Sequence, residues 1–308
     1  MENYSVQRLS ALNIGHLASL YRTANNQIVP SDFLLKKYDT KKLGTSFIGF
    51  IAYSKQGLPI AYYGVIPMLL KLEGETILAA QGADTMTHPD FRKQGLFYLL
   101  ARETFQLARE NNIRFIFGFA NQNSLPGAVK LQFQIMPSAL QLFTIKTEAP
   151  PIGRLMTKSK ILGKIYQTYL HFTLSGRQFF PATVFQSDGL NGVSHDQSFF
   201  EYKTYHKSYF VKLNKHFLWL KVDGSLKVGL VKFAEEPPQN FIKKIKRLAV
   251  VLGCREVIFI TNKNSNLYKF LSQVIHPTDA LPICFQNLTS GSVPFEKIEF
   301  EYGDIDIF

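Results

Sequence analysis

The stretch that decides the fold is ADTMTHPDFRKQGLFYLLA, residues 83–101. Its first part predicts an extended strand that ends at His88, because the proline after His88 restricts that residue to extended geometry. A basic turn at 92–95 follows, and apolar residues at helical spacing then predict a helix over 96–110. The stretch therefore predicts a strand, a glycine-bearing turn and a helix in direct succession.

The turn has the features of an anion-binding site. It consists of Arg92, Lys93, Gln94 and Gly95, and the first amides of the helix that follows have no acceptor within the helix. These amides and the positive end of the helix dipole favour phosphate oxygens. Gly95 has no Cβ, which allows a sharp bend or a close approach of phosphate. The chemistry predicted is pyrophosphate binding, and the alternative is a charged surface loop.

The composition indicates a folded, sheet-containing protein with more than one domain. The chain has 308 residues, of which 46% are hydrophobic and 14% aromatic, enough for two domains with their own cores. The net charge of +12 suits phosphate-bearing ligands, an anionic membrane face or nucleic acid. A solvated basic surface without a specific polyanionic partner is the alternative.

Cysteine usage and the chain start bear on localisation. Cys254 and Cys284 have neither the spacing of a metal site nor that of a disulfide framework, so we expect no metal and a reducing compartment. The first residues lack a basic region followed by an apolar run, and no apolar stretch reaches the roughly 18 residues that a membrane span needs. We therefore expect a cytoplasmic protein without a transmembrane segment.

An internal repeat divides the chain. Residues 114–124, RFIFGFANQNS, align with residues 255–265, REVIFITNKNS, and each copy predicts helix, strand, turn and helix. The segment at 75–95, with its strand and basic turn, has no counterpart in the second copy. We therefore expect a ligand-binding turn in the first half alone. The expected division of the chain is a ligand-binding domain at 1–149, a helical linker at 150–195 and a degenerate second domain at 196–308.

The turn resembles a known family motif. The His-Pro-x-Tyr-Arg-Gly-x-Gly-Ile segment of the GCN5-related N-acyltransferases (GNATs) contains an Arg/Gln-x-x-Gly-x-Gly/Ala turn that holds the pyrophosphate of coenzyme A. The turn in this chain, Arg92-Lys93-Gln94-Gly95-Leu96-Phe97, is similar to it, with Phe97 in place of the last small residue. The resemblance covers residues 30–145 and implies a mixed α/β GNAT fold with two GNAT-like halves, the second without the pyrophosphate loop.

A second segment supports the resemblance. A GNAT branch associated with cell-surface polysaccharide loci often shows Gly-Phe-x-Asn-x-x-Ser, and this chain has Gly118-Phe119-Ala120-Asn121-Gln122-Asn123-Ser124. These Asn and Ser residues are expected either to contact the cofactor or to cap the next helix. The resemblance thus implies that acyl-CoA, with acetyl-CoA as the expected donor, contacts the following residues: Met86, Thr87, His88, Arg92, Lys93, Gln94, Gly95, Leu96, Phe97, Asn121, Asn123 and Ser124.

Two residues are candidates for catalysis. The resemblance implies that strand amides at Met86, Thr87 and His88 pair with the pantetheine arm, and that one of them, assigned to Met86, binds the thioester oxygen. Asp84 is the candidate base for an amine acceptor, or else a carboxylate satisfied by its neighbours. Strand alternation places Asp84, Met86 and His88 on one face.

The resemblance implies direct transfer of an acyl group to an amine acceptor, with an aminosugar as a candidate. One alternative is a peptidoglycan-type aminoacyltransferase that uses aminoacyl-tRNA; the retained turn favours coenzyme A, so we expect no nucleic-acid partner. Another is a non-catalytic acyl-CoA-binding protein, because residues 127–133 lack the Tyr that protonates the leaving thiolate in many GNATs. The last segment, 301–308, alternates acidic and apolar residues and predicts a half-buried strand. The alternative is that this segment places a terminal carboxylate in the active site as the base.

Overall fold

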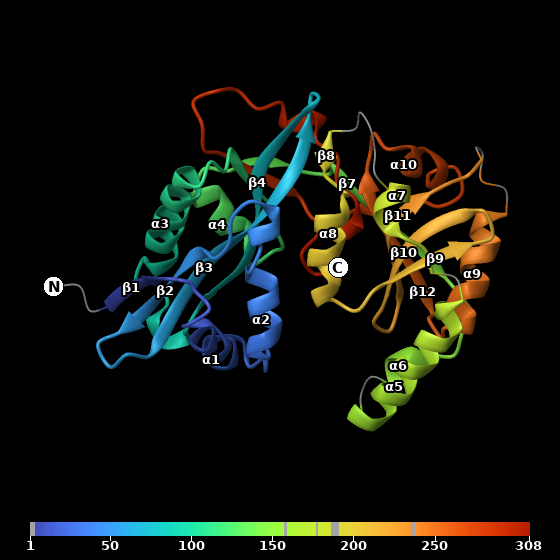
Figure 1. The fold of residues 1–308 in the computed structure, drawn as a ribbon, viewed down its shortest axis with the longest axis horizontal. Helices are drawn as coiled ribbons and strands as arrows, with labels where there is room; N and C mark the ends of the chain where they lie inside the picture. Colours follow the sequence, from blue (N-terminus) through green and yellow to red (C-terminus); the bar gives the residue numbers. More distant parts are fainter. Residues whose placement is uncertain (1–3, 157–158, 177, 186–190, 236–237, 239) are drawn as a thin grey trace.

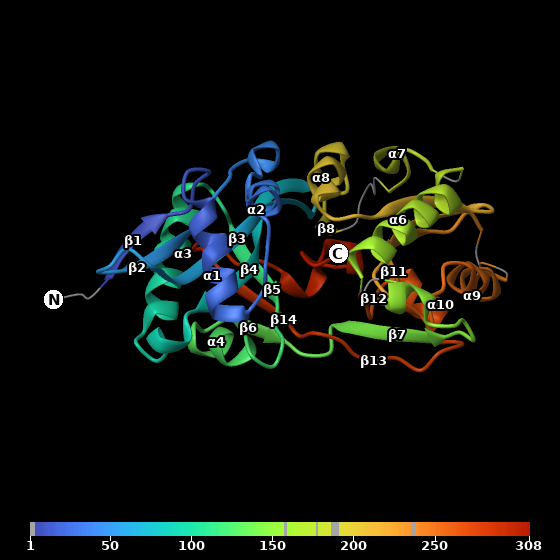
Figure 2. The ribbon, with the colours of Figure 1, turned by 90° about the horizontal axis from the view of Figure 1, so that it is seen from below.

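The computed structural model describes residues 4–156, 159–176, 178–185, 191–235, 238 and 240–308. The chain folds into two lobes that lie side by side, and the last residues of the chain lie between them (Figures 1 and 2). Each lobe is built on one mixed β-sheet with helices packed on it.

The first lobe is formed by the N-terminal half of the chain. Its strands and helices are, in order, β1 Tyr4–Arg8, α1 Ile14–Asn25, α2 Ser31–Tyr38, η1 Lys41–Leu43, β2 Ile48–Ser54, β3 Pro59–Leu72, β4 Glu75–Thr87, η2 Pro89–Phe91, α3 Leu96–Glu110, β5 Phe115–Phe119, α4 Leu125–Lys130 and β6 Gln134–Met136. The expected strand, turn and helix at 83–101 are confirmed as β4, the segment at 88–95 and α3.

The second lobe follows the same plan after a helical connection. Its elements are β7 Leu140–Lys146, α5 Ile152–Met156, α6 Lys160–Ser175, α7 Pro181–Phe185, β8 Gly192–Val193, α8 Gln197–Tyr202, η3 Lys203–Tyr205, β9 Tyr209–Leu213, β10 His216–Val222, β11 Leu226–Lys232, α9 Phe241–Val251, β12 Glu256–Asn262, α10 Asn266–Leu271, β13 Thr278–Asp279, β14 Ile283–Asn287, η4 Phe295–Lys297 and η5 Tyr302–Asp304. The strand predicted in the second repeat copy, residues 255–265, is present as β12, and Gly253 after α9 has a left-handed φ of 67°.

Strands cross between the lobes in both directions, because β8 and β14 from the second half of the chain pair with strands of the first sheet and β7 belongs to the second sheet. The first sheet has the order β1-β2-β3-β4-β5-β14-β6, so β14 from the second half lies between two strands of the first. In return, β7 pairs with β12 and β13 of the second sheet. Figure 2 shows this crossing of the chain between the lobes. The predicted domain boundaries at residues 149 and 195 divide the sequence into consecutive segments. The two sheets do not follow these segments, because β7 lies in the second sheet and β14 in the first.

A shared core joins the lobes. Helices α1 and α2 cover the face of the first sheet that also meets the second lobe, and α3 covers the opposite face. In β10 the side chains alternate: Trp219 belongs to the shared core, while Leu218 and Leu220 belong to a separate core under α6 and α9. The second sheet therefore has an inner face toward the first lobe and an outer face under these two helices.

The strand predicted for residues 301–308 is not formed. Glu301 makes a single antiparallel bridge to Thr261, and the chain then turns through η5. The Glu301 side chain accepts from the Asp304 amide, while the Asp304 side chain accepts from the Glu301 amide, which closes a capping box. The acidic residues thus bond to local backbone rather than alternating along a strand.

Candidate functional site

The key feature of the first lobe is a parallel strand pair that separates. β4 pairs with β5 at Ala80↔Ile116 and Gln81↔Phe117 only, and β4 then runs on to Thr87 without a partner on that side. A bulge lies in this unpaired part: Gly64 of β3 faces Ala83 and Tyr62 faces Met86, so one residue of β3 opposes two of β4. We call the space between the separated strands the first gap.

The bulge changes the side-chain pattern expected for β4. Asp84 has a left-handed φ of 45°, and Ala83 and Met86 both enter the shared core. Simple alternation would place these two on opposite faces. Asp84, which contacts Lys37 and Tyr38 of α2, lies on the inner side of the strand with Met86, as predicted, but Ala83 lies on that side as well, so the alternation is interrupted at the bulge. The extra residue of the bulge shifts the pattern by one position.

The amides near the end of β4 are not equivalent. His88 donates its amide to the carbonyl of Ile60 on β3 (2.8 Å). Because successive amides of an extended strand point in opposite directions, the Thr87 amide faces the β5 side, and the Met86 amide faces β3. Of the three residues expected to bind the pantetheine arm, Thr87 is therefore the one whose amide is directed toward the first gap.

The turn after β4 exposes a run of backbone amides. Lys93 and Gly95 both have positive φ, 62° and 79°, and α3 begins without a side-chain cap. Within the described part of the chain, no acceptor takes the amides of residues 93–98; the first bond of the helix runs from Leu99 to the Gly95 carbonyl. A Cβ on Gly95 would have no atom within 4 Å. These orphan amides and the open space fit a diphosphate group.

The side chains of the turn leave this space open. Arg92 Nε donates to the Thr87 carbonyl (3.3 Å), and Gln94 lies beside the Asp90 carbonyl. Arg92, Lys93 and Gln94 are all exposed. The turn therefore keeps its positive charge at the surface, next to the orphan amides, where it complements an anion.

Phe97 is accommodated by a glycine on α4. Its ring packs edge-on against Tyr63 of β3, with centroids 5.5 Å apart. A Cβ on Gly127 would lie 2.8 Å from the Phe97 ring, so only glycine leaves room for it there. The large residue at this position thus points into the lobe and not into the turn.

Asn121 and Ser124 bond to each other across the turn before α4. Asn121 Oδ1 accepts the amides of Asn123 (2.9 Å) and Ser124 (3.1 Å). In the second lobe, Ser265 Oγ accepts the Tyr268 amide at the start of α10. Both copies therefore use these residues to organise a helix start, and the amide nitrogen of the Asn121 side chain has no acceptor among the described residues.

A buried charge cluster lies on the inner side of β4. Asp84 Oδ2 is 2.7 Å from Lys37 Nζ and accepts from the Tyr38 hydroxyl at 2.6 Å. Lys37 also contacts Asp306 Oδ2 at 3.0 Å, so one lysine bridges the strand and the last segment of the chain. We call Lys37, Tyr38, Asp84 and Asp306 the bridging cluster.

Pairing sets the charge states in this cluster. Burial would raise the pKa of Asp84, but the Lys37 ammonium and hydrogen bonds from Lys37, Tyr21 and Tyr38 outweigh burial, so the pKa is lowered. Burial would lower the pKa of Lys37, yet Asp84 and Asp306 raise it well above its usual value. Asp84 is therefore an ionised carboxylate at neutral pH, paired with Lys37 and hydrogen-bonded by Tyr38.

The sequence pointed to Asp84 but missed its partners. Lys37 follows Leu34 by three positions, and both residues are buried on one face of α2. A lysine at a buried helical position is unusual unless it is paired, which is the signal that could have found it. Asp306 was not identifiable, because its proximity depends on the path of the chain between the lobes.

The last segment of the chain is held by further side chains. Lys203 donates to the Ile305 carbonyl (2.8 Å), Tyr205 and His206 donate to the Asp306 carbonyl, and Lys221 donates to the Ile307 carbonyl. Burial lowers the pKa of Lys203 to about 7 and that of His206 to about 3. His206 is therefore neutral, and its Nε2 carries the proton that bonds to Asp306.

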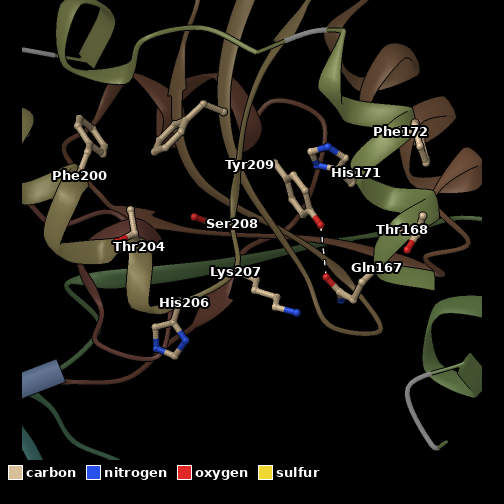
Figure 3. A pocket seen from close by; sticks show the side chains of 11 residues that line it. Gln167, Thr168, His171, Phe172, Phe200, Thr204, His206, Lys207, Ser208 and Tyr209 are labelled. Atoms are coloured by element: carbon tan, nitrogen blue, oxygen red, sulfur yellow. Dashed lines mark hydrogen bonds between the residues drawn. The ribbon is translucent and has the colours of Figure 1, made fainter. Parts of the chain in front are cut away.

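A cavity of about 590 Å³ lies in the second lobe, away from the turn. Figure 3 shows side chains from α6 on one side and from the η3–β9 segment on the other, with the Tyr209 hydroxyl 3.4 Å from Gln167 Oε1. His206 lines the cavity and also contacts Asp306, which Lys37 connects to Asp84. A chain of contacts thus leads from the cavity to β4.

Two sequence expectations concern absences. Within residues 4–308, apart from the undescribed positions, no group of three or more His, Cys, Asp or Glu side chains is arranged to hold a metal. No helix of the described segments has both the length and the hydrophobicity required to cross a membrane.

Solved structures share this architecture. No model of a known protein family matches the sequence, and no curated protein does. A GCN5-related N-acetyltransferase from Kribbella flavida superposes with a TM-score of 0.58 at 10% identity, over 92% of this chain and 72% of its own. One from Anabaena variabilis gives 0.54 at 11% identity, over 93% and 73%. A candidate acetyltransferase from Pyrococcus horikoshii gives 0.56 at 12%, over 99% and 95%.

These likenesses establish the fold. The chain has the fold of the GCN5-related N-acetyltransferases, and the match extends over both lobes. The predicted mixed α/β architecture with two GNAT-like halves is therefore confirmed.

Proposed function

We propose that this protein is an acyl-CoA-dependent N-acyltransferase with its coenzyme site in the first lobe. The observation that carries the proposal is the separation of β4 from β5 directly before a turn whose amides, at residues 93–98, have no acceptor in the described chain. The fold shared with N-acetyltransferases supports the same assignment. Acetyl-CoA is the proposed donor, and it supplies the activated thioester.

The residues of the first lobe divide the task. The amides of residues 93–98, with Arg92 and Lys93, bind the diphosphate, and the first gap receives the pantetheine arm. The Thr87 amide, fixed by the strand, donates a hydrogen bond to the thioester oxygen as negative charge develops there. Met86 and His88, on either side of it, hold the strand in place through their bonds to β3.

The bridging cluster contains the proposed base. Asp84, paired with Lys37 on the inner side of β4, remains the proposed base for the proton of the acceptor amine. The lowered pKa of Asp84 has a consequence for that role, because a base with a low pKa stays ionised in mild acid. If Asp84 is the base, its protonation should therefore lower kcat/KM only at pH values below the ordinary carboxyl range.

We propose an amine on a small molecule as acceptor, with aminosugars as the first candidates. A thiol-release assay with acetyl-CoA and a panel of aminosugars, polyamines and peptides tests this directly. The expected result is thiol release that depends on one class of amine and is lost in Gly95→Asp. Tight coenzyme binding without turnover across the panel would contradict catalysis and indicate an acyl-CoA-binding protein, and transfer from aminoacyl-tRNA would contradict the donor.

A further inference from the structure

The outer face of the second lobe presents a surface formed by α5, α6 and α9. Tyr166 and Tyr169 of α6 donate their hydroxyls to the Leu252 and Val251 carbonyls at the end of α9, which holds the helices side by side. Gly153 of α5 donates its amide to the Gly253 carbonyl. Figure 1 shows α5 and α6 projecting from the lower end of the second lobe. We call the exposed residues of these helices the distal surface.

Helix α6 is apolar on two opposite sides. Its inner side packs Tyr166, Leu170 and Leu174 into the core of the second lobe. Its outer side carries Ile161, Ile165 and Phe172, whose side chains are 74%, 55% and 74% exposed. The spacing of these three residues places them on one stripe of the helix, opposite the buried one. Single exposed apolar residues are normal on a protein surface, but a contiguous stripe of large apolar side chains indicates a binding surface.

Neighbouring apolar residues extend this stripe. The distal surface also exposes Ile152, Leu155, Leu162, Val250 and Val251. Two of them are the last residues of α9, adjacent to the Tyr169 hydroxyl. The apolar area therefore continues from one helix to the next and is not confined to α6.

The charge of the distal surface has one sign. From residue 149 to 187 the sequence contains no Asp or Glu, and the described basic side chains of α5 and α6 include Arg154 and Lys164. From 237 to 255 it again contains no acidic residue, with basic residues at Lys243, Lys244, Lys246, Arg247 and Arg255. Asp223, beside Gly224 and Arg154, is paired with Lys227 at 2.7 Å. Clustered cations of this kind attract a surface of negative charge.

The combination of aliphatic and basic residues favours an anionic bilayer over nucleic acid as the partner of the distal surface. Nucleic acid binding uses aromatic rings that stack on bases between the cations. Here the exposed apolar residues are mainly aliphatic, and side chains such as Ile161 and Ile165 gain most by entering hydrocarbon. Aliphatic residues flanked by lysines are typical of helices that lie in the membrane interface.

We propose that the distal surface binds the surface of a bilayer that contains anionic phospholipids. The Ile161–Ile165–Phe172 stripe enters the boundary between headgroups and acyl chains, and the basic residues of α6 and α9 contact lipid phosphates. The turn before α3 belongs to the other lobe, so membrane contact leaves it accessible (Figure 1). This inference does not depend on the acyltransferase assignment.

Vesicle co-sedimentation tests the proposal. We expect the wild type to bind vesicles of phosphatidylcholine mixed with phosphatidylglycerol, to bind pure phosphatidylcholine at least tenfold more weakly, and to lose affinity as salt increases. Ile165→Glu combined with Phe172→Glu should weaken binding to the mixed vesicles at least tenfold. Both side chains are exposed, so circular dichroism and the melting temperature should remain those of the wild type.

A matched variant in the first lobe serves as control. Leu12 and Ile28 are 98% and 83% exposed, and Leu12→Glu combined with Ile28→Glu should leave vesicle binding unchanged. Equal loss in both double variants would show a general charge effect and overturn the proposal. If the α6 variant bound mixed vesicles like the wild type and RNA displaced the protein from them, the surface would bind RNA and the proposal would be overturned. If sedimentation velocity showed a wild-type dimer that the α6 variant lacks, the surface would bind a second copy of the chain, which would also overturn it.

Discussion

The two lobes each contain a parallel strand pair that separates, and the surroundings of the two resulting spaces differ. β4 and β5 part after Gln81↔Phe117, and β11 and β12 part after Val228↔Phe259. In both lobes a glycine follows the last paired residue of the first strand. A Cβ on Gly82 would meet only the Phe117 carbonyl, at 3.6 Å, whereas one on Gly229 would lie 2.5 Å from the ring of Phe308.

The second space is filled by the chain itself. Phe308 packs edge-on against Trp219, with ring centroids 4.7 Å apart, and Glu301 bonds to Thr261 of β12. The sequence directly before α9, residues 233–240, contains no Lys or Arg. The repeat thus keeps its strand geometry in both copies, and we propose that coenzyme binding depends on the turn after the strand and on the groups that occupy the space beyond it.

The largest expected effect concerns the charges beside the first gap. Lys37→Met leaves Asp84 and Asp306 buried without their shared cation, and removing one partner of a buried pair costs about 3–5 kcal/mol. The free energy of unfolding from urea titration should fall by that amount. Lys42→Met, at an exposed pair with Glu201, is the matched control and should change little. A stable Lys37→Met protein would mean that the cluster does not support the first gap.

The next largest effect is on the affinity for acetyl-CoA, which should depend on the turn in the first lobe. Gly95→Asp adds a negative charge where phosphate is expected and imposes a left-handed φ of 79° on a residue with a side chain. Affinity for acetyl-CoA in calorimetry should fall about 100-fold. Gly57 has nearly the same φ, 78°, and equally open surroundings, so Gly57→Asp should bind like the wild type. Unchanged affinity in Gly95→Asp would remove the turn from the site.

A smaller effect tests whether the second space is filled. Gly229→Ala forces the Phe308 ring to move and should lower the free energy of unfolding by about 1–3 kcal/mol without changing coenzyme affinity. Gly82→Ala meets only an ordinary contact in the first lobe and should be tolerated better. If the two substitutions destabilise equally, the contrast between an open and a filled space is not real.

The smallest effect is a pH dependence in the segment that fills the second space. The pKa of Lys203 is about 7 in the folded protein and near 10.5 when exposed, so the unfolded chain binds more protons between these values. Stability should therefore rise as pH increases through this window, by roughly 1 kcal/mol per pH unit. Lys203→Met should flatten the rise in urea titrations. A slope that is the same in both proteins would contradict a buried, neutral Lys203.

Local patterns in the sequence predicted the first lobe well. The proline after His88, the basic turn and the apolar spacing of α3 are determined by neighbouring residues, so β4, the turn and α3 could be placed. The repeat likewise predicted β12 and the helix start at Ser265. Gly95 could be identified as a special position because only local backbone geometry is involved.

Long-range features could not be predicted. The exchange of β7 and β14 depends on which sheet each strand meets, and neither strand carries that information in its own residues. The bulge at Asp84 and the bridge from Lys37 to Asp306 arise from contacts across most of the chain. The alternation at 301–308 predicted a strand that does not form, because the side chains of Glu301 and Asp304 each bond to the other's backbone amide.

A crystal structure with bound coenzyme A tests the central claim most directly. We expect the diphosphate within hydrogen-bond reach of the amides at residues 93–98 and the pantetheine arm between β4 and β5, with Phe308 still packed beside Gly229. Coenzyme bound between β11 and β12, or elsewhere without contact to the turn before α3, would show that the first lobe does not hold the coenzyme as proposed.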